Sequence, residues 1–381
     1  MNRKTVMLVF GTRPEAIKMA PLYQELAERE GLRVLCCVTA QHREMLDSVL
    51  ELFDIAPDYD LDLMKPGQTL PMITTGVLHG MEQVLAGAKP DLILVHGDTS
   101  TTFAGALAAF YAQIPVGHVE AGLRTFDRYS PFPEEMSRKL VGSLAELHFC
   151  PTERNRENLA CERITEGVFV TGNTVIDALK TTVRETYSYE TAELASVLDG
   201  KKLVLITCHR RENYGQPMED IMSAIRELAA LHPNLNFVYP VHLSGVVQEV
   251  AHRVLDGIAN VFLVPPLPPA DMHNLMGASY LIMTDSGGLQ EEAPALGKPV
   301  LVLRKETERP EAVEAGTVQV VGVERADIVA AAQQLLTDET AYAAMAHAVN
   351  PYGDGQACRR IADAIEWYFG LRQEKPEKFS V

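Results

Sequence analysis

The run Thr284-Asp285-Ser286-Gly287-Gly288-Leu289-Gln290-Glu291-Glu292 directly follows the apolar stretch 280–283. This pattern predicts a strand that ends at the N-terminus of a helix. Its two glycines let the backbone approach a ligand closely, and free N–H groups together with the helix dipole favour a phosphate. Glu292, about one turn into the helix, is placed to accept hydrogen bonds from sugar hydroxyls. The stretch therefore predicts a nucleotide diphosphate held by the second half of the chain.

Similar apolar runs, rich in Val, Ile and Leu, alternate with longer amphipathic segments on both sides of this stretch. In the first half they cover residues 5–10, 33–38, 92–96, 116–119, 147–150 and 168–171; in the second half they cover 203–207, 237–240, 261–264, 281–284, 300–303 and 317–321. Runs of this kind are typical of parallel strands that are buried on both faces and separated by helices.

The pattern predicts an α/β fold of two doubly wound, Rossmann-like domains, with ligands bound in the cleft that the two domains face. We expect an N-terminal domain at residues 1–172 and a nucleotide-binding domain at 173–352. The amphipathic helix and tail at 353–381 are expected to pack back across the cleft.

Composition limits the classes of partner. The 381 residues include 34 basic and 51 acidic side chains, a net charge of -17 that repels nucleic acid and anionic membranes. The apolar run at 6–10 is far too short for a signal peptide or a bilayer crossing, so we expect a cytoplasmic protein. The six cysteines are scattered without metal-ligand spacing, which indicates free, mostly buried thiols and no metal site.

Three carboxylates stand at successive strand-to-helix connections of the first half. Asp98 stands where a helix N-cap belongs, so capping alone is one explanation of it. Glu120 ends a strand in His118-Val119-Glu120-Ala121-Gly122, where glutamate is a poor turn residue. Glu134 opens a helix that carries Arg138 one turn later, and the helix dipole alone also favours an acid there. Their joint occurrence at three successive connections is not expected by chance.

Basic side chains follow strands in both halves. Arg13 and Lys18 occupy the first turns of a helix that Pro14 starts, and each is alternatively an ordinary surface charge. His209 and Arg210 directly follow the strand at 203–207, and His242 repeats this placement more weakly. Arg309 follows another strand and is expected to reach the phosphate at 286–288.

Several blocks of this sequence, in order along nearly the whole chain, resemble one family: the bacterial non-hydrolysing UDP-N-acetylglucosamine 2-epimerases. This family has the two-domain glycosyltransferase-B architecture. The resemblance is carried by GTRPEAIKMAPL (11–22), VHGDTSTTFAGALAAFY (95–111), GHVEAGLRT (117–125), PFPEEMSRKL (131–140), HRREN (209–213) and TDSGGLQEEAPALGKPVLVLRKETERPEAV (284–313).

The resemblance implies interconversion of UDP-N-acetylglucosamine and UDP-N-acetylmannosamine for bacterial cell-envelope polysaccharides. UDP is eliminated to leave 2-acetamidoglucal and is then added back on the other face. No nicotinamide cofactor is implied, in agreement with the lack of a GxGxxG fingerprint in the sequence. The resemblance also implies a homodimer.

By the same resemblance, Asp98, Glu120 and Glu134 form the acid/base and charge-stabilising set, with His209 near the diphosphate. The substrate-binding and UDP-binding positions are Arg13, Lys18, Arg138, Ser286, Gly287, Gly288, Glu292 and Arg309. Some bacterial members bind a second UDP-N-acetylglucosamine as an activator, and the matching positions are Gln41, Arg210 and His242. Gly67 departs from the basic residue of some regulated members.

Three alternatives stay open. One is a glycosyltransferase of the same fold, which joins the sugar to a separate acceptor. Another is a non-catalytic nucleotide-sugar sensor, which binds UDP without turnover. The third is a 2-epimerase that acts on a diacetamido-uronic UDP-sugar.

Overall fold

The computed structural model describes residues 3–40, 43–65, 67–197 and 200–381. The chain forms two compact units. Unit 1 contains Met1–Thr181 and Tyr352–Ser380, and unit 2 contains Thr182–Pro351.

Unit 1 contains a seven-stranded parallel sheet in the order β3-β2-β1-β4-β5-β6-β7. Its strands are β1 (Lys4–Phe10), β2 (Leu32–Val38), β3 (Tyr59–Asp60), β4 (Leu92–His96), β5 (Val116–Val119), β6 (Leu147–Cys150) and β7 (Val168–Val170). Its helices are α1 (Arg13–Ala27), α2 (Arg43–Leu52), α3 (Leu70–Ala88), α4 (Ser100–Tyr111), α5 (Glu134–Leu144), α6 (Glu153–Cys161), α7 (Thr174–Thr182) and α15 (Ala357–Tyr368).

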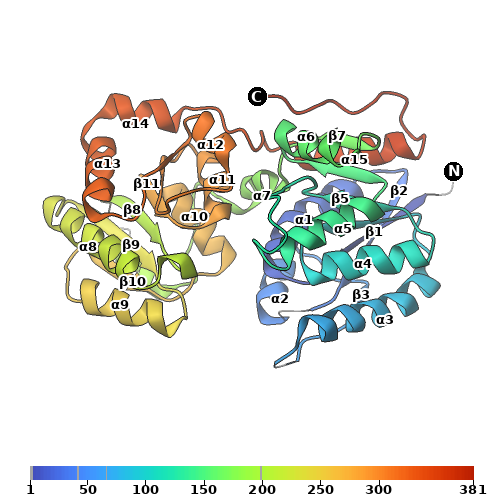
Figure 1. Ribbon diagram of the computed structural model, residues 1–381, viewed down its shortest axis with the longest axis horizontal. Helices are drawn as coiled ribbons and strands as arrows, with labels where there is room; N and C mark the ends of the chain where they lie inside the picture. The colour runs from blue at the N-terminus through green and yellow to red at the C-terminus, as the bar shows by residue number, and fades with distance from the viewer. Residues whose placement is uncertain (1–2, 41–42, 66, 198–199) are drawn as a thin grey trace. The chain divides into compact units, whose positions relative to one another are not determined.

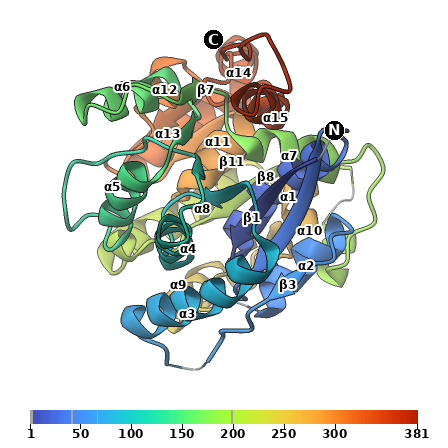
Figure 2. The same ribbon diagram turned by 90° about the vertical axis from the view of Figure 1, so that its right-hand side faces the viewer.

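Alternate side chains of β1 enter two different cores, as the period of two in a strand requires. Val6 and Leu8 pack with α1, α2 and α15 on one face, whereas Met7 and Val9 pack with α3 and α4 on the other. Figures 1 and 2 both show α3 running alongside α4. Helices therefore cover both faces of the sheet, which brings the polar loops to the carboxyl ends of its strands.

The boundary between the units differs from the expected one at residue 172. The start of α15 is fastened to α7, because the Asp177 carboxylate accepts the backbone N–H groups of Ala357 and Cys358 at 3.1 and 3.0 Å. The backbone N–H of Asn173 also donates to the carbonyl of Tyr352 at 2.7 Å. These contacts keep most of α7 in unit 1, so the division falls at Thr181. The C-terminal helix belongs to unit 1 as well, where it packs on α1.

Unit 2 contains a six-stranded parallel sheet in the order β10-β9-β8-β11-β12-β13. Its strands are β8 (Lys202–Thr207), β9 (Leu235–Pro240), β10 (Val261–Val264), β11 (Leu281–Thr284), β12 (Val300–Val302) and β13 (Val318–Val320). Its helices are α8 (Gln216–Leu231), α9 (Gly245–Leu255), α10 (Pro269–Ala278), α11 (Gly287–Ala295), α12 (Pro310–Glu314), α13 (Arg325–Thr337) and α14 (Glu339–Ala346), with short 3₁₀ turns at Ala192–Ser196 and Arg211–Asn213.

The predicted strands and their parallel pairing are confirmed in both halves. Both units have the doubly wound arrangement. In each sheet the strand order changes direction at the first strand, between β1 and β4 in unit 1 and between β8 and β11 in unit 2. The two-residue strand β3 was not predicted. None of the helices in the described residues has the length and apolar character that a bilayer crossing requires. All six cysteines are free thiols, and only that of Cys161 is exposed.

Candidate active site

The loop between β1 and α1 is held by the buried carboxylate of Glu15. Its Oε2 accepts the backbone N–H groups of Gly11 and Thr12 at 3.1 and 2.8 Å, and its Oε1 accepts the hydroxyl of Thr99 at 2.7 Å. Burial raises the pKa of Glu15, and the hydrogen bonds oppose the rise. The carboxylate therefore ties the start of α1 to the start of α4, which fixes the position of Arg13.

Arg13 is the first residue of α1 and is half-buried. Burial lowers the pKa of its guanidinium, and no carboxylate of the described residues offsets this effect. A partly desolvated cation of this kind is suited to an anionic ligand.

Glu120, directly after β5, is clamped by residues that are distant in the sequence. Its Oε1 accepts hydrogen bonds from Lys18 Nζ at 2.5 Å and from Asn173 Nδ2 at 3.1 Å. Its Oε2 lies 3.3 Å from His96 Nε2. Its backbone adopts a φ of 62°, a left-handed conformation that is costly for a residue with a side chain and is concentrated at functional sites. The structure thus brings together two predicted site residues, Lys18 and Glu120.

Three buried histidines lie on neighbouring strands beside this clamp. His118 and His148 are neighbours in the register of β5 and β6, and His96 ends β4. Burial lowers the pKa values of His96, His118 and His148 to about 4, 3 and 4. All three rings are therefore neutral at pH 7. His118 Nε2 lies 2.7 Å from the carbonyl oxygen of Gly97, so it carries the proton of the neutral ring.

Asp98 forms an ion pair with Arg138, in which two guanidinium nitrogens contact the same carboxylate oxygen. Arg138 Nε and Nη2 lie 2.9 and 2.7 Å from Asp98 Oδ2, and Nη1 lies 3.4 Å from Glu135 Oε2. The capping explanation of Asp98 is wrong, because the N-cap of α4 is Thr99, whose hydroxyl accepts the Thr102 N–H at 3.1 Å. The Asp98 carboxylate therefore pairs with Arg138 of α5 instead of capping α4.

Glu134 and Glu135 open α5 with contrasting environments. Glu135 is fully buried and accepts the backbone N–H groups of Thr125 and Phe126 at 3.0 and 3.1 Å. Glu134 Oε2 is also buried, but it has no hydrogen-bond partner among the described residues. Burying a carboxylate oxygen without a hydrogen-bond partner costs free energy. This oxygen is therefore a candidate for direct contact with a ligand.

The predicted phosphate site in unit 2 has the expected local structure. Ser286 is the N-cap of α11, and its side chain makes no capping hydrogen bond. A Cβ added to Gly287 would lie only 3.0 Å from Arg309 Cζ, so the guanidinium lies directly against this glycine. Arg309 is itself oriented by Glu291, with Nε 2.8 Å from Oε1. The structure therefore brings a cation to the N-terminus of the helix.

Glu292 lies on the same helix, half-buried. A Cβ added to Gly288 would lie 3.1 Å from its Oε1. Its Oε2 lies 3.8 Å from Nε2 of the buried His273, whose Nδ1 is 2.7 Å from the Thr182 hydroxyl. The carboxylate expected to contact a sugar is thus held one turn beyond the glycine pair.

The segment after β8 wraps around the buried carboxylate of Asp285. Asp285 Oδ2 accepts the backbone N–H groups of His209 and Arg210, both at 2.8 Å, and the Asn213 side-chain amide at 3.1 Å. The ring of His209 stacks on that of His242, with centroids 5.2 Å apart and planes at 12°. Two predicted site residues from different loops therefore meet. Gln41, the third predicted activator position, lies outside the described residues.

Several residues that orient these groups were not predicted as site residues: Glu15, His96, Glu135, Asn173 and Asp285. Only Glu15 had a local signal, since Thr12 and Glu15 have the spacing of a capping box. The others act through partners far along the chain, which no local pattern reveals.

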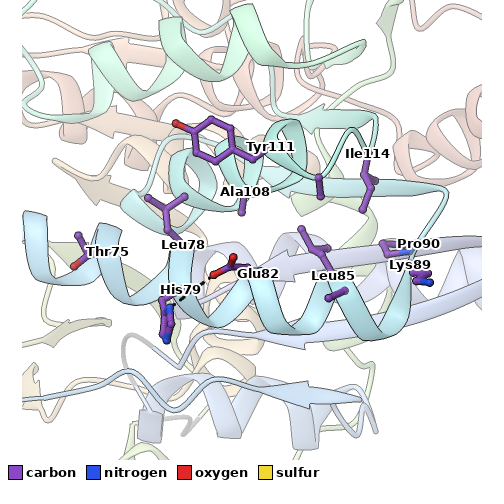
Figure 3. A pocket seen from close by; sticks show the side chains of 12 residues that line it. Thr75, Leu78, His79, Glu82, Leu85, Lys89, Pro90, Ala108, Tyr111 and Ile114 are labelled. Carbon is purple, nitrogen blue, oxygen red and sulfur yellow. Dashed lines mark ion pairs between the residues drawn. The ribbon is translucent and has the colours of Figure 1, made fainter.

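A hollow of about 790 Å³ lies elsewhere on unit 1, between α3 and α4. Figure 3 shows Leu78 and Leu85 of α3 facing Ala108 and Tyr111 of α4 across it. None of the predicted site residues lines this hollow. Its lining is mostly apolar, in contrast to the charged groups gathered at the strand ends.

Two doubly wound units, one with a helix N-terminus suited to phosphate and one with carboxylates at its strand ends, define the glycosyltransferase-B class of architecture. A glycotransferase of kitacinnamycin shares this fold, with a TM-score of 0.63 and 14% identity over 96% of this chain and 99% of that chain.

Comparison with known sequences identifies the family. The family model described as UDP-N-acetylglucosamine 2-epimerase matches residues 24–366. The UDP-N-acetylglucosamine 2-epimerase of Bacillus subtilis (strain 168) is 52% identical over 381 residues, covering 100% of both chains. The crystal structure of the UDP-GlcNAc 2-epimerase of Neisseria meningitidis bound to UDP-GlcNAc is 49% identical, with a TM-score of 0.86 over 96% of this chain and 100% of that chain. The chain belongs to the UDP-N-acetylglucosamine 2-epimerase family.

Proposed function

We propose that this protein interconverts UDP-N-acetylglucosamine and UDP-N-acetylmannosamine by eliminating UDP and adding it back. The observation that carries the proposal is the carboxylate set of unit 1, in which Glu134 presents a buried oxygen without a partner among the described residues. Family membership supplies the substrate class, since the Neisseria meningitidis relative is bound to UDP-GlcNAc.

The chemistry explains why several carboxylates are needed. The C2 proton of the sugar is not acidic until the C1–O bond to UDP begins to break and positive charge develops at the ring. A base then takes the C2 proton, the C–H electron pair forms the C1=C2 bond of 2-acetamidoglucal, and UDP leaves with the C1–O pair. Return of a proton to the other face of C2, with attack of UDP on C1, completes epimerisation.

The environments of the carboxylates favour different roles. Asp98, held by its ion pair with Arg138, is suited to stabilise positive charge at the ring. Glu134 is suited to contact the substrate directly as an acid/base group, because no described group occupies its Oε2. Glu120 is held in one orientation by Lys18 and Asn173, which suits it to a positioned role in the proton transfers. A general acid or base is worth about 10²–10⁴ in rate, so losing any of the three should nearly abolish turnover.

Unit 2 is proposed to bind the UDP part of the substrate. The backbone N–H groups of Gly287 and Gly288 and the guanidinium of Arg309 supply positive charge for the diphosphate, whereas the Ser286 N–H already donates to the Thr284 hydroxyl at 2.9 Å. Glu292 binds ribose hydroxyls, and His209 acts beside the diphosphate. Arg13 of unit 1 is a further cation for the substrate.

Proton NMR in D₂O with UDP-N-acetylglucosamine tests this function. We expect deuterium at C2 together with new anomeric signals from UDP-N-acetylmannosamine. The variants Asp98→Asn, Glu120→Gln and Glu134→Gln should lose both signals while still binding UDP. Asp91→Asn is the matched control, because Asp91 lies at the other end of β4, where it pairs with Lys4 at 2.8 Å; its exchange should equal that of the wild type.

The other outcomes of this experiment separate the alternatives. UDP binding without C2 exchange would refute the epimerase proposal for this substrate, and transfer to an added acceptor would then identify a glycosyltransferase. Exchange with a diacetamido-uronic UDP-sugar only would identify the related epimerase. Binding with no reaction of any of these sugars would indicate a sensor.

We also propose a cytoplasmic homodimer. Tyr111 and Phe110, beside the hollow between α3 and α4, are 70% and 57% exposed, and exposed apolar patches often mark interfaces. Light scattering should give the mass of a dimer, and Tyr111→Lys should lower the measured mass.

An activator site at Arg210 and His242 predicts a sigmoidal dependence of the rate on UDP-N-acetylglucosamine concentration. A hyperbolic dependence would exclude such a site.

A further inference from the structure

Asp285 has one carboxylate oxygen that no described group satisfies. The side chain is fully buried, and Oδ2 carries three hydrogen bonds, yet Oδ1 has no hydrogen-bond partner among the described residues. His209 Nδ1 lies 3.5 Å from this oxygen, just beyond a good hydrogen bond. Burying such an oxygen is costly, so its retention requires an explanation.

The charged and titratable groups that face the His209 ring come from three loops. Asp285 follows β11, His242 follows β9, and Arg210 is the next residue along the chain. Burial lowers the pKa of His209; Asp285 opposes this effect, and protonated His242 and Arg210 add to it. His242 Nδ1 accepts the Ser244 backbone N–H at 3.1 Å, so the neutral His242 ring carries its proton on Nε2. In the absence of a ligand, His209 is therefore neutral near pH 8.

We propose that Asp285 is a positioning residue, whose Oδ1 accepts the Nδ1–H of His209 so that Nε2 takes up a proton when a nucleoside diphosphate binds. This inference rests on the proposed function only for the identity of the ligand. The proton comes from solvent and is added to Nε2, which then donates it to a phosphate oxygen. Asp285 balances the positive charge on the ring, as a carboxylate does for the histidine of a catalytic triad.

The fixed tautomer has a direct consequence. With its proton on Nδ1, the neutral ring presents a lone pair at Nε2, which repels a phosphate oxygen. Tight binding of the diphosphate then requires the second proton. Because UDP is fully ionised at pH 8, any proton taken up on binding there enters the protein.

Calorimetry of UDP binding at pH 8, in two buffers with different ionisation enthalpies, measures this uptake. The wild-type protein should take up a substantial fraction of one proton per UDP. Asp285→Asn keeps an oxygen for the backbone N–H groups but presents an amide N–H to Nδ1, which forces the proton of the neutral ring onto Nε2. The variant should bind UDP with almost no proton uptake, and its kcat should fall by about 10² or more.

Asp271→Asn is the matched control for loss of a buried aspartate in unit 2. Asp271 accepts the Tyr187 hydroxyl and the Thr191 backbone N–H, both at 2.8 Å, and should affect stability without changing proton uptake. Equal uptake in Asp285→Asn and the wild type, or none in the wild type, overturns the inference. If Asp285→Asn does not fold, ¹⁵N NMR of the wild type decides: His209 protonated on Nε2 at pH 8 without ligand is inconsistent with the proposal. The epimerase assay is independent, since UDP binding requires no turnover.

Discussion

The three neutral histidines of unit 1 predict a specific loss of stability in acid. Burial holds the pKa values of His96, His118 and His148 near 4, 3 and 4, against about 6.5 in an unfolded chain. Between these values the unfolded state binds more protons than the folded state. The stability that the neutral rings provide is therefore complete above about pH 6.5 and is lost as the pH falls towards 4.

Each ring that is protonated only in the unfolded state contributes about 1.4 kcal/mol per pH unit, so the three together contribute about 4 kcal/mol per unit between pH 6 and 5. By pH 5 the loss amounts to about 6 kcal/mol, comparable to the whole stability of many domains. His148→Gln removes one of the three and should reduce the slope by about a third. His79→Gln is the control, because His79 on α3 is 77% exposed.

The single tryptophan makes unit 1 observable on its own. Trp367 lies on α15 and packs edge-on against Phe169, with ring centroids 6.1 Å apart. Urea unfolding followed by tryptophan fluorescence, repeated from pH 7.5 to 5, gives the slope for each variant. Parallel pH profiles for the wild type and His148→Gln would refute the reasoning.

Three further predictions concern single side chains. Gly287→Ala places a Cβ 3.0 Å from the guanidinium over the phosphate site, so calorimetry should show UDP affinity reduced about ten-fold, a cost of about 1.4 kcal/mol; Gly245→Ala, which meets nothing within 4 Å at the start of α9, should leave it unchanged. Lys18→Met should reduce the free energy of unfolding of unit 1 by about 1–3 kcal/mol, less than for a fully buried pair because the two side chains are 16% and 14% exposed; an unchanged urea midpoint would contradict this. Phe379→Ala should lower the free energy of unfolding by about 3 kcal/mol, since this residue is only 6% exposed, whereas Val381→Ala, at a residue 74% exposed, should have no effect on unfolding.

The sequence predicted the two parallel sheets because their strands are buried on both faces and appear as continuous apolar runs. It did not predict β3, because a strand of two residues has no detectable pattern. Tyr59 and Asp60 form a strand only because Cys37 and Val38 offer a free sheet edge. Register at an edge depends on a partner strand far along the chain, and sequence periodicity does not report that partner.

The residue types of the site were more predictable than their partners. Asp98 and Thr99 are adjacent, and either is a good cap; the observed choice follows from the position of Arg138 on α5. The clamp on Glu120 joins residues separated by 102 and 53 positions. Such contacts depend on the completed sheet, so local patterns do not show them.

Unit 1 is made from two separate stretches of chain, with unit 2 inserted between them. On a ribosome that adds about 5–20 residues per second, the inserted part takes roughly 10–30 s to appear. During that time α1 lacks its neighbour α15, and its apolar side chains Met19 and Leu22 have an incomplete core. Unit 2 is continuous and is the first that can complete its fold. Unit 2 can therefore complete its fold before unit 1, although the larger stretch of unit 1 is synthesised first.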